Sequence, residues 1–94
     1  MVNAETANLL QRAAAELKRA GAREVYVFGS AAQDANSIAS DLDLAVSGLP
    51  PSVFYRIGAR ISDLIGRSVD LIDLDISTPF TRHLRAENEL VRVG

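Results

Sequence analysis

The sequence lacks cysteine and tryptophan, and it has neither an excess of positive charge nor a long apolar run. The absence of cysteine excludes disulfides, thiolate catalysis and cysteine-ligated zinc. Ten basic residues against twelve acidic ones give a net charge of −2, which argues against a general nucleic-acid-binding protein. No stretch reaches the roughly 18 apolar residues that span a bilayer, and the N-terminal residues lack the basic segment of a secretory signal. We therefore expect a cytoplasmic protein that contacts neither membranes nor nucleic acid directly.

The chain has 94 residues, 48% of them hydrophobic, which allows one hydrophobic core. It contains no internal repeat, no low-complexity segment and no interdomain linker. We expect residues 1–94 to form a single domain.

Three segments have the apolar periodicity of amphipathic helices, with capping residues near their ends. They are residues 3–20, with Asn3 as N-cap; the segment between the chain break at residues 47–51 and Gly66, with an apolar stripe of Phe54, Ile57, Ile61, Leu64 and Ile65; and residues 79–87, with Thr78 as N-cap. Four other segments favour strands because they are rich in β-branched or alternating apolar residues. These are residues 24–28, 41–46, 68–74 and, as an edge strand, 89–93.

The order of these elements predicts an α/β fold, α-β-β-α-β-α-β, with helices packed on a small mixed sheet. Only a polar loop at residues 33–40 separates the first two strands, so they should pair antiparallel. A helix joins the second and third strands, as parallel neighbours require.

Aspartate is uncommon inside strands, yet Asp41, Asp43 and Asp70 lie in otherwise apolar strand segments. Residues two apart in a strand share a face, so Asp41 and Asp43 would project together. Asp70 can join them if the third strand lies beside the second. Three convergent carboxylates repel one another unless a cation neutralises them, and such oxygen ligands suit Mg²⁺ or Mn²⁺.

Other interpretations of these acids stay open. An Asp-x-Asp pair also occurs at loop edges, and Asp70 can be a solvent-facing residue of an edge strand. Asp73 and Asp75 compete with Asp70 for its role. We favour Asp70 because Val69 and Leu71 would then face the core, whereas Asp73 and Asp75 run toward the end of the strand.

Gly29 and Ser30 follow the first strand, where antiparallel pairing would place them next to the start of the second. Glycine lets the backbone approach a ligand closely, and the N–H groups of a turn or helix beginning at Ser30 would face a phosphate. A Gly-Ser pair after a strand is in most proteins only a turn. A phosphate site beside metal-binding acids is typical of nucleotidyl transfer with two metal ions.

Three motifs in this order resemble those of the minimal nucleotidyltransferase (MNT) family, within the DNA polymerase β-like superfamily. They are VFGS at residues 27–30, SDLDL at residues 40–44 and VDL at residues 69–71. The resemblance covers nearly the whole chain, and it implies a nucleotidyltransferase palm fold. It also implies two Mg²⁺ ions held by Asp41, Asp43 and Asp70, and a nucleoside triphosphate bound by Gly29 and Ser30.

Many members of this family are antitoxins encoded beside a HEPN-domain toxin. The resemblance therefore implies transfer of a nucleoside monophosphate, AMP from ATP, to a hydroxyl, with a tyrosine of a HEPN partner as acceptor. A palm of this size has no separate region to grip the base or the acceptor. A partner chain or a homo-oligomer is expected to complete the site.

The sequence departs from the family after Ser30. Family members have an Ala-Arg-Gly-like segment there, whereas residues 31–34 are AAQD and carry no positive charge. Arg82 or Arg85 on the last helix is a candidate substitute. The departure supports an alternative function, a catalytically weak binding module that neutralises a HEPN toxin by complex formation. A purely structural domain would leave three strand aspartates unexplained.

The remaining polar and aromatic candidates favour structural roles. The single histidine, His83, has no second histidine or cysteine near it in sequence and is expected on a helix surface. Tyr26 and Tyr55 are expected in the core or an interface. A solvated helix face that can meet an acidic partner is formed by Arg56, Arg60 and Arg67.

Overall fold

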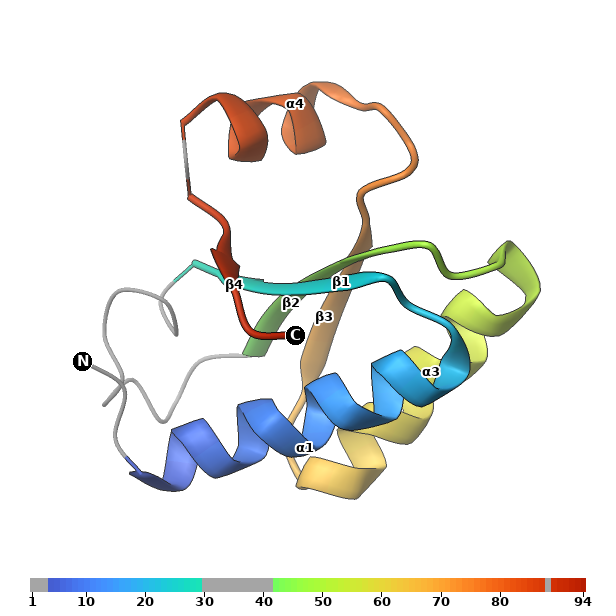
Figure 1. Ribbon diagram of the computed structural model, residues 1–94, viewed down its shortest axis with the longest axis vertical. Helices are drawn as coiled ribbons and strands as arrows, with labels where there is room; N and C mark the ends of the chain where they lie inside the picture. Colours follow the sequence, from blue (N-terminus) through green and yellow to red (C-terminus); the bar gives the residue numbers. More distant parts are fainter. Residues whose placement is uncertain (1–3, 30–41, 88) are drawn as a thin grey trace.

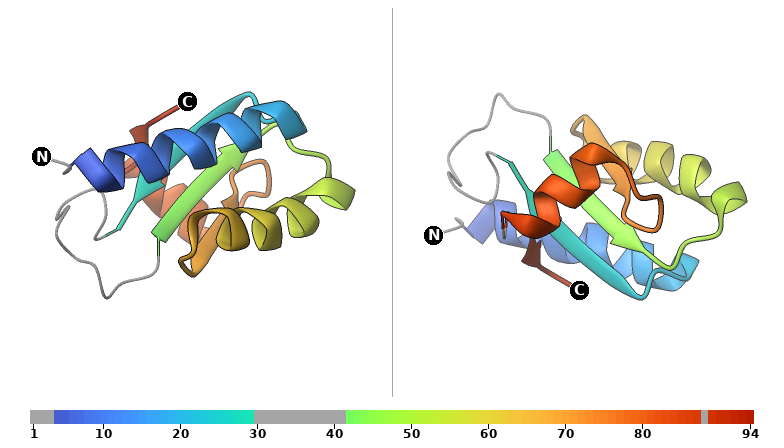
Figure 2. Two further views of the ribbon diagram at one scale, coloured as in Figure 1. Left: turned by 90° about the horizontal axis from the view of Figure 1, so that it is seen from below. Right: turned by 90° about the horizontal axis from the view of Figure 1, so that it is seen from above.

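The computed structural model describes residues 4–29, 42–87 and 89–94. Within these ranges the chain forms α1 (Ala4–Ala20), β1 (Glu24–Phe28), β2 (Leu42–Ser47), α3 (Pro51–Ile65), β3 (Val69–Asp73), α4 (Pro79–Ala86) and β4 (Val91–Arg92). Helices α1 and α3 cover one face of a sheet and α4 lies over the other face (Figure 1). Figure 2 shows the two covered faces from below and from above.

The sheet has the strand order β3-β2-β1-β4. Strands β1 and β2 pair antiparallel, and β2 and β3 pair parallel, as the sequence predicts. Strand β4 pairs antiparallel with β1 at the edge of the sheet, but it is shorter than the predicted strand at residues 89–93. The predicted α/β fold with a small mixed sheet is confirmed.

Alternation along the strands divides the apolar side chains between two cores. Leu42, Leu44 and Val46 of β2 face the larger core, together with Val25 and Val27 of β1. The helices contribute Leu10, Ala13, Leu17, Ile57 and Ile61 to this core. The smaller core lies on the other face of the sheet and contains Phe28, Ala45, Leu74 and Leu84. Leu84 belongs to α4, so this second core fixes that helix over the sheet.

The predicted end of α3 at Gly66 and the predicted start of α4 after Thr78 are both confirmed. Gly66 follows α3 with a φ of 70°, and its N–H donates to the carbonyl oxygen of Ser62. Thr78 caps α4. The predicted N-cap Asn3 lies outside the described residues.

Leu64 corrects the predicted apolar stripe of α3. It is 38% exposed, whereas Ile57, Ile61 and Ile65 are buried. The buried residues follow one i, i+4 row, and Leu64 is rotated by about 100° from Ile65 around the helix axis.

Candidate active site

The strand register brings two of the three predicted acids together. Asp43 of β2 lies directly opposite Asp70 of β3, and Phe28, the last residue of β1, lies opposite Asp43. Asp43 shares a sheet face with Ala45, which belongs to the core beneath α4. Phe28, Asp43 and Asp70 therefore form a row across one end of the sheet, on the α4 face; we call this row the acid row.

The acid row has the chemistry of a divalent-cation site. Asp43 is half-buried and Asp70 is exposed. Like charges directly opposite each other on neighbouring strands are destabilising, and a bound cation would remove this repulsion. Within the described ranges no group of three or more His, Cys, Asp or Glu side chains can hold a metal ion. The third predicted acid, Asp41, lies outside these ranges.

Gly29 leaves space for the carboxylate of Asp43. It follows β1 with a φ of +71°, a backbone conformation that residues with a side chain rarely adopt. A Cβ at this position would collide with Oδ2 of Asp43 and lie 3.3 Å from its Cγ. The backbone at Gly29 is therefore packed directly against the acid row. Ser30, predicted beside it, lies outside the described residues.

Asp73 and Asp75 lie away from the acid row. Asp73 is opposite Val46, at the other end of the β2–β3 pair. Its Oδ1 accepts a hydrogen bond from the Asp75 N–H at 2.9 Å, and Oδ2 of Asp75 accepts one from the Gly48 N–H at 2.7 Å. These carboxylates hold the turns at that end of the sheet, so the structure favours Asp70 as the partner of Asp43.

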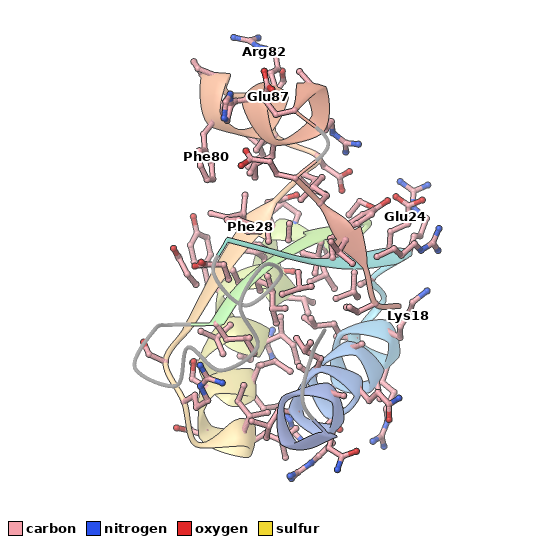
Figure 3. The ribbon with its side chains drawn as sticks, turned by 90° about the vertical axis from the view of Figure 1, so that its left-hand side faces the viewer. Lys18, Glu24, Phe28, Phe80, Arg82 and Glu87 are labelled. Carbon is pink, nitrogen blue, oxygen red and sulfur yellow. The ribbon has the colours of Figure 1, made fainter. Side chains whose placement is uncertain are left out.

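Phe80, which the sequence analysis did not single out, lies next to the acid row. Its ring packs edge-on against Phe28, with 5.9 Å between centroids and 64° between planes. Figure 3 shows Phe80 projecting from α4 toward Phe28. Phe80 is 48% exposed, whereas Phe28 is buried. A large apolar residue directly after the Thr78-Pro79 helix start was the only sequence signal of this position.

Neither arginine of α4 is placed to replace the missing positive charge near the acid row. Arg85 lines a depression of about 310 Å³ with Arg23, Glu24 and Ser47, at the opposite end of the sheet. Arg82 points away from the sheet in Figure 3, and its Nη1 donates to Oγ of Ser77 at 3.4 Å. The expectation that one of them substitutes is not supported. The sequence alone did not locate them because both depend on how α4 crosses the sheet.

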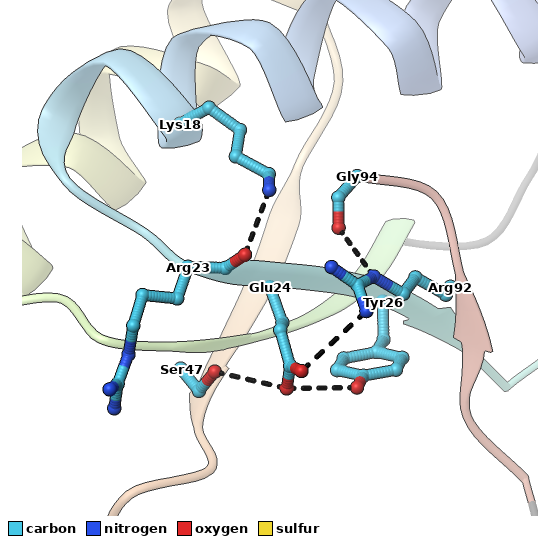
Figure 4. A network of polar contacts seen from close by, with 7 residues as sticks. All are labelled: Lys18, Arg23, Glu24, Tyr26, Ser47, Arg92 and Gly94. Atoms are coloured by element: carbon cyan, nitrogen blue, oxygen red, sulfur yellow. Dashed lines mark hydrogen bonds and ion pairs between the residues drawn. The ribbon is translucent and has the colours of Figure 1, made fainter.

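A polar network at this opposite end connects β1 to the edge strand β4 (Figure 4). The Tyr26 hydroxyl donates to Oε1 of Glu24 at 3.0 Å, and Oε2 of Glu24 lies 3.6 Å from Nη1 of Arg92. The hydrogen bond from Tyr26 and the charge of Arg92 lower the pKa of Glu24 despite partial burial. Burial and the hydrogen bond to Glu24 raise the pKa of Tyr26. Tyr26 therefore has a structural role, as predicted.

Other predicted surface groups also have structural settings. His83 is exposed on α4, with Nε2 3.2 Å from Oε2 of Glu89. Arg60 of α3 reaches Glu16 of α1, with 3.5 Å between Nε and Oε2. Tyr55 is 81% exposed on α3, so it is not a core residue.

The family model for polymerase beta nucleotidyltransferases matches residues 12–92, and the chain belongs to this family. Among solved structures, the chain is similar to a candidate minimal nucleotidyltransferase, with 26% identity and a TM-score of 0.72 over 89% of this chain and 88% of that one. A comparison with the curated proteins gives no match.

Two further solved structures with the same fold are toxin–antitoxin complexes. One contains AMP-PNP and matches with 19% identity and a TM-score of 0.70, over 87% of this chain and 70% of that chain. The other is a tri-AMPylated Shewanella oneidensis HEPN toxin with its MNT antitoxin, at 18% identity and a TM-score of 0.63. That match covers 92% of this chain and 70% of the other. In the described part of the chain, no helix is long and apolar enough to cross a membrane.

Proposed function

We propose that this protein transfers AMP from ATP to a hydroxyl group, the acceptor being a tyrosine of a HEPN toxin that it thereby neutralises. The observation that carries the proposal is the register of β2 and β3, which sets Asp43 opposite Asp70. Membership of the polymerase beta nucleotidyltransferase family supports the reaction class. The similarity to an MNT antitoxin in complex with an AMPylated HEPN toxin supports the acceptor.

The acid row fits a divalent cation, because two opposed carboxylates supply the oxygen ligands that Mg²⁺ and Mn²⁺ prefer. Asp43 and Asp70, together with Asp41, would hold two Mg²⁺ ions. Bound there, the ions would neutralise the charge of the triphosphate and of the departing pyrophosphate.

The chain's own groups would orient the reactants. Gly29, with no side chain, lets the backbone approach the triphosphate, and Ser30 would bind it from the following residue. The acceptor hydroxyl oxygen forms a bond to the α-phosphorus, and the bond from that phosphorus to the bridging oxygen of the β-phosphate breaks. Asp70, the exposed acid, would take the hydroxyl proton, and pyrophosphate would leave.

A partner chain or a second copy of this chain would complete the site. Asp70 is exposed, so its carboxylate can be reached by a side chain of another protein. The acceptor tyrosine would approach the acid row from this open side.

The alternative function is a binding module that neutralises a HEPN toxin by occupancy. Residues 31–34 carry no positive charge, and Arg85 lies at the opposite end of the sheet from Asp43. Without a cationic side chain from residues 31–34 or from α4, the site would stabilise the departing pyrophosphate less well. This observation favours weak or absent catalysis.

Intact-mass spectrometry separates the two functions. The protein is incubated with Mg²⁺, ATP and the protein encoded by the neighbouring gene, the candidate HEPN partner. We expect the partner to gain the mass of one or more AMP units. A stable complex without any gain in mass would contradict transfer and establish the binding module.

A further inference from the structure

We propose that Phe80 is the surface on which the nucleobase of the bound nucleoside triphosphate stacks. The inference rests on the proposed function, since it takes the phosphates to lie at the acid row. It adds a base-binding residue to a site whose acids and Gly29 contact only the phosphate end of the nucleotide.

The position of Phe80 matches the reach of a nucleotide. Its ring contacts Phe28, which stands in the acid row directly opposite Asp43. Neighbouring strands lie about 4.8 Å apart, so Phe28 is one strand spacing from Asp43. Phe80 lies one ring contact beyond Phe28. A nucleotide with its triphosphate at the acids would therefore reach the exposed ring of Phe80 with its base.

The ring of Phe80 is fixed at one edge and exposed to solvent over much of its surface. Its edge contact with Phe28 fixes one side, because Phe28 belongs to the buried core that includes Leu84 of α4. The capped helix start fixes its backbone, since Thr78 and Thr81 bond to each other across the first turn. Nearly half of its surface is nevertheless exposed. An aromatic ring held at one edge can receive a base without first being ordered.

Stacking of this kind would not select one base. Every base has a π face, so an aromatic side chain binds different bases with similar strength. We therefore expect Phe80 to contribute to the affinity for nucleoside triphosphates in general. Docking of a partner protein on Phe80 is the competing explanation for its exposure, and the experiment below distinguishes it.

The test compares two ligands that differ only in whether they carry a base and ribose. Calorimetry measures the Kd of ATP and of inorganic tripolyphosphate, each with Mg²⁺, for the wild type and for variants. We expect Phe80→Ala to weaken ATP binding about tenfold and to leave tripolyphosphate binding unchanged. Phe80→Tyr should restore ATP binding, because it restores the ring.

Tyr55→Ala is the matched control. Tyr55 is an exposed aromatic residue on α3, which covers the other face of the sheet. This variant should bind both ligands as the wild type does. Thermal unfolding of Phe80→Ala verifies that the comparison uses a folded protein.

Two results would overturn the inference while leaving the proposed function intact. In one, Phe80→Ala binds ATP as tightly as the wild type; loss of the HEPN complex in that variant would then assign Phe80 to partner docking. In the other, Phe80→Ala weakens ATP and tripolyphosphate equally, which indicates a general disturbance of the site. A wild-type protein that binds neither ligand, alone or in complex with its partner, would overturn the proposed function and this inference together.

Discussion

Because Gly29 has no side chain, its backbone packs directly against the carboxylate of Asp43 in the acid row. The residue adopts a φ of +71°, and the space that a Cβ would fill is taken by the carboxylate of Asp43. Gly66 at the end of α3 has nearly the same φ, 70°, but a Cβ there meets nothing within 4 Å. The two glycines therefore separate the effect of backbone conformation from the effect of crowding Asp43.

This difference predicts distinct outcomes for two alanine variants. Gly29→Ala and Gly66→Ala should each lose about 1 kcal/mol of unfolding free energy from the left-handed conformation. Only Gly29→Ala should also lose transferase activity, because its methyl group displaces Asp43. Chemical denaturation and the transfer assay measure the two effects. Equal activity in both variants would contradict a role for this contact.

Glu24 and Tyr26 predict how stability depends on pH. The pKa of Glu24 is lowered from 4.5, so its contribution is present above that pH and is lost as pH falls through the lowered value. The pKa of Tyr26 is raised from 10.0, so its contribution is present below pH 10.0 and is lost as pH rises through the raised value. Their stabilising effect should therefore be constant between these limits.

We expect Tyr26→Phe to lower Tm between pH 4.5 and 10.0 and to differ less from the wild type at both extremes. The variant removes the hydroxyl that donates to Glu24. Thermal unfolding across this range measures the difference. The control, Tyr55→Phe, removes the hydroxyl of an exposed side chain and should leave Tm close to that of the wild type. A Tyr26→Phe difference that is the same at every pH would contradict the assignment.

Among the elements, α4 is positioned by its N-terminal cap. The Thr81 N–H donates to Oγ1 of Thr78 at 3.1 Å, and the Thr78 N–H donates to Oγ1 of Thr81 at 2.9 Å. Thr81 is 4% exposed, so the cap is also packed against the rest of the molecule. Because Phe80 lies within this first turn, the cap fixes the part of α4 that is nearest the acid row.

Thr78→Ala should cost about 1 kcal/mol of unfolding free energy, because it leaves an N–H of the first turn without its acceptor. Ser77→Ala is the control, since Ser77 is exposed and its Oγ accepts a hydrogen bond of 3.4 Å from Arg82. That variant should stay within about 0.5 kcal/mol of the wild type. Equal losses in urea denaturation would show that the cap does not stabilise α4.

Local sequence patterns predicted most helices and strands, but not how the helices are rotated and placed against the sheet. The alternation at residues 24–28 and the Thr78-Pro79 start gave strand β1 and helix α4 directly, because these signals lie within the element itself. The buried row of α3 excluded Leu64, since that depends on how the helix is rotated against the sheet. The position of Arg85 depends on how α4 crosses the sheet. A local sequence pattern specifies neither the rotation of α3 against the sheet nor the angle at which α4 crosses it.

At the scale of the whole molecule, the candidate site is a consequence of sheet register. The sequence predicted that Asp43 and Asp70 would converge if their strands were neighbours, and the parallel pairing of β2 with β3 provides that arrangement. A slip of one residue would turn Asp70 to the opposite face of the sheet. This register is a relation between two strands that α3 separates in sequence, so the motif spacing alone did not determine it.

The most direct test of the account compares two aspartates of the same strand. Asp70 lies in the acid row, whereas Asp73 lies at the other end of β3 and accepts a hydrogen bond from Asp75. The measurement is the rate of AMP transfer from ATP to the HEPN partner, followed by intact mass, for Asp70→Asn and Asp73→Asn. We predict that Asp70→Asn is slower by about a hundredfold or more, whereas Asp73→Asn retains the wild-type rate. Transfer at the wild-type rate by Asp70→Asn, or an equal loss in both variants, would contradict the assignment of the acid row as the catalytic centre.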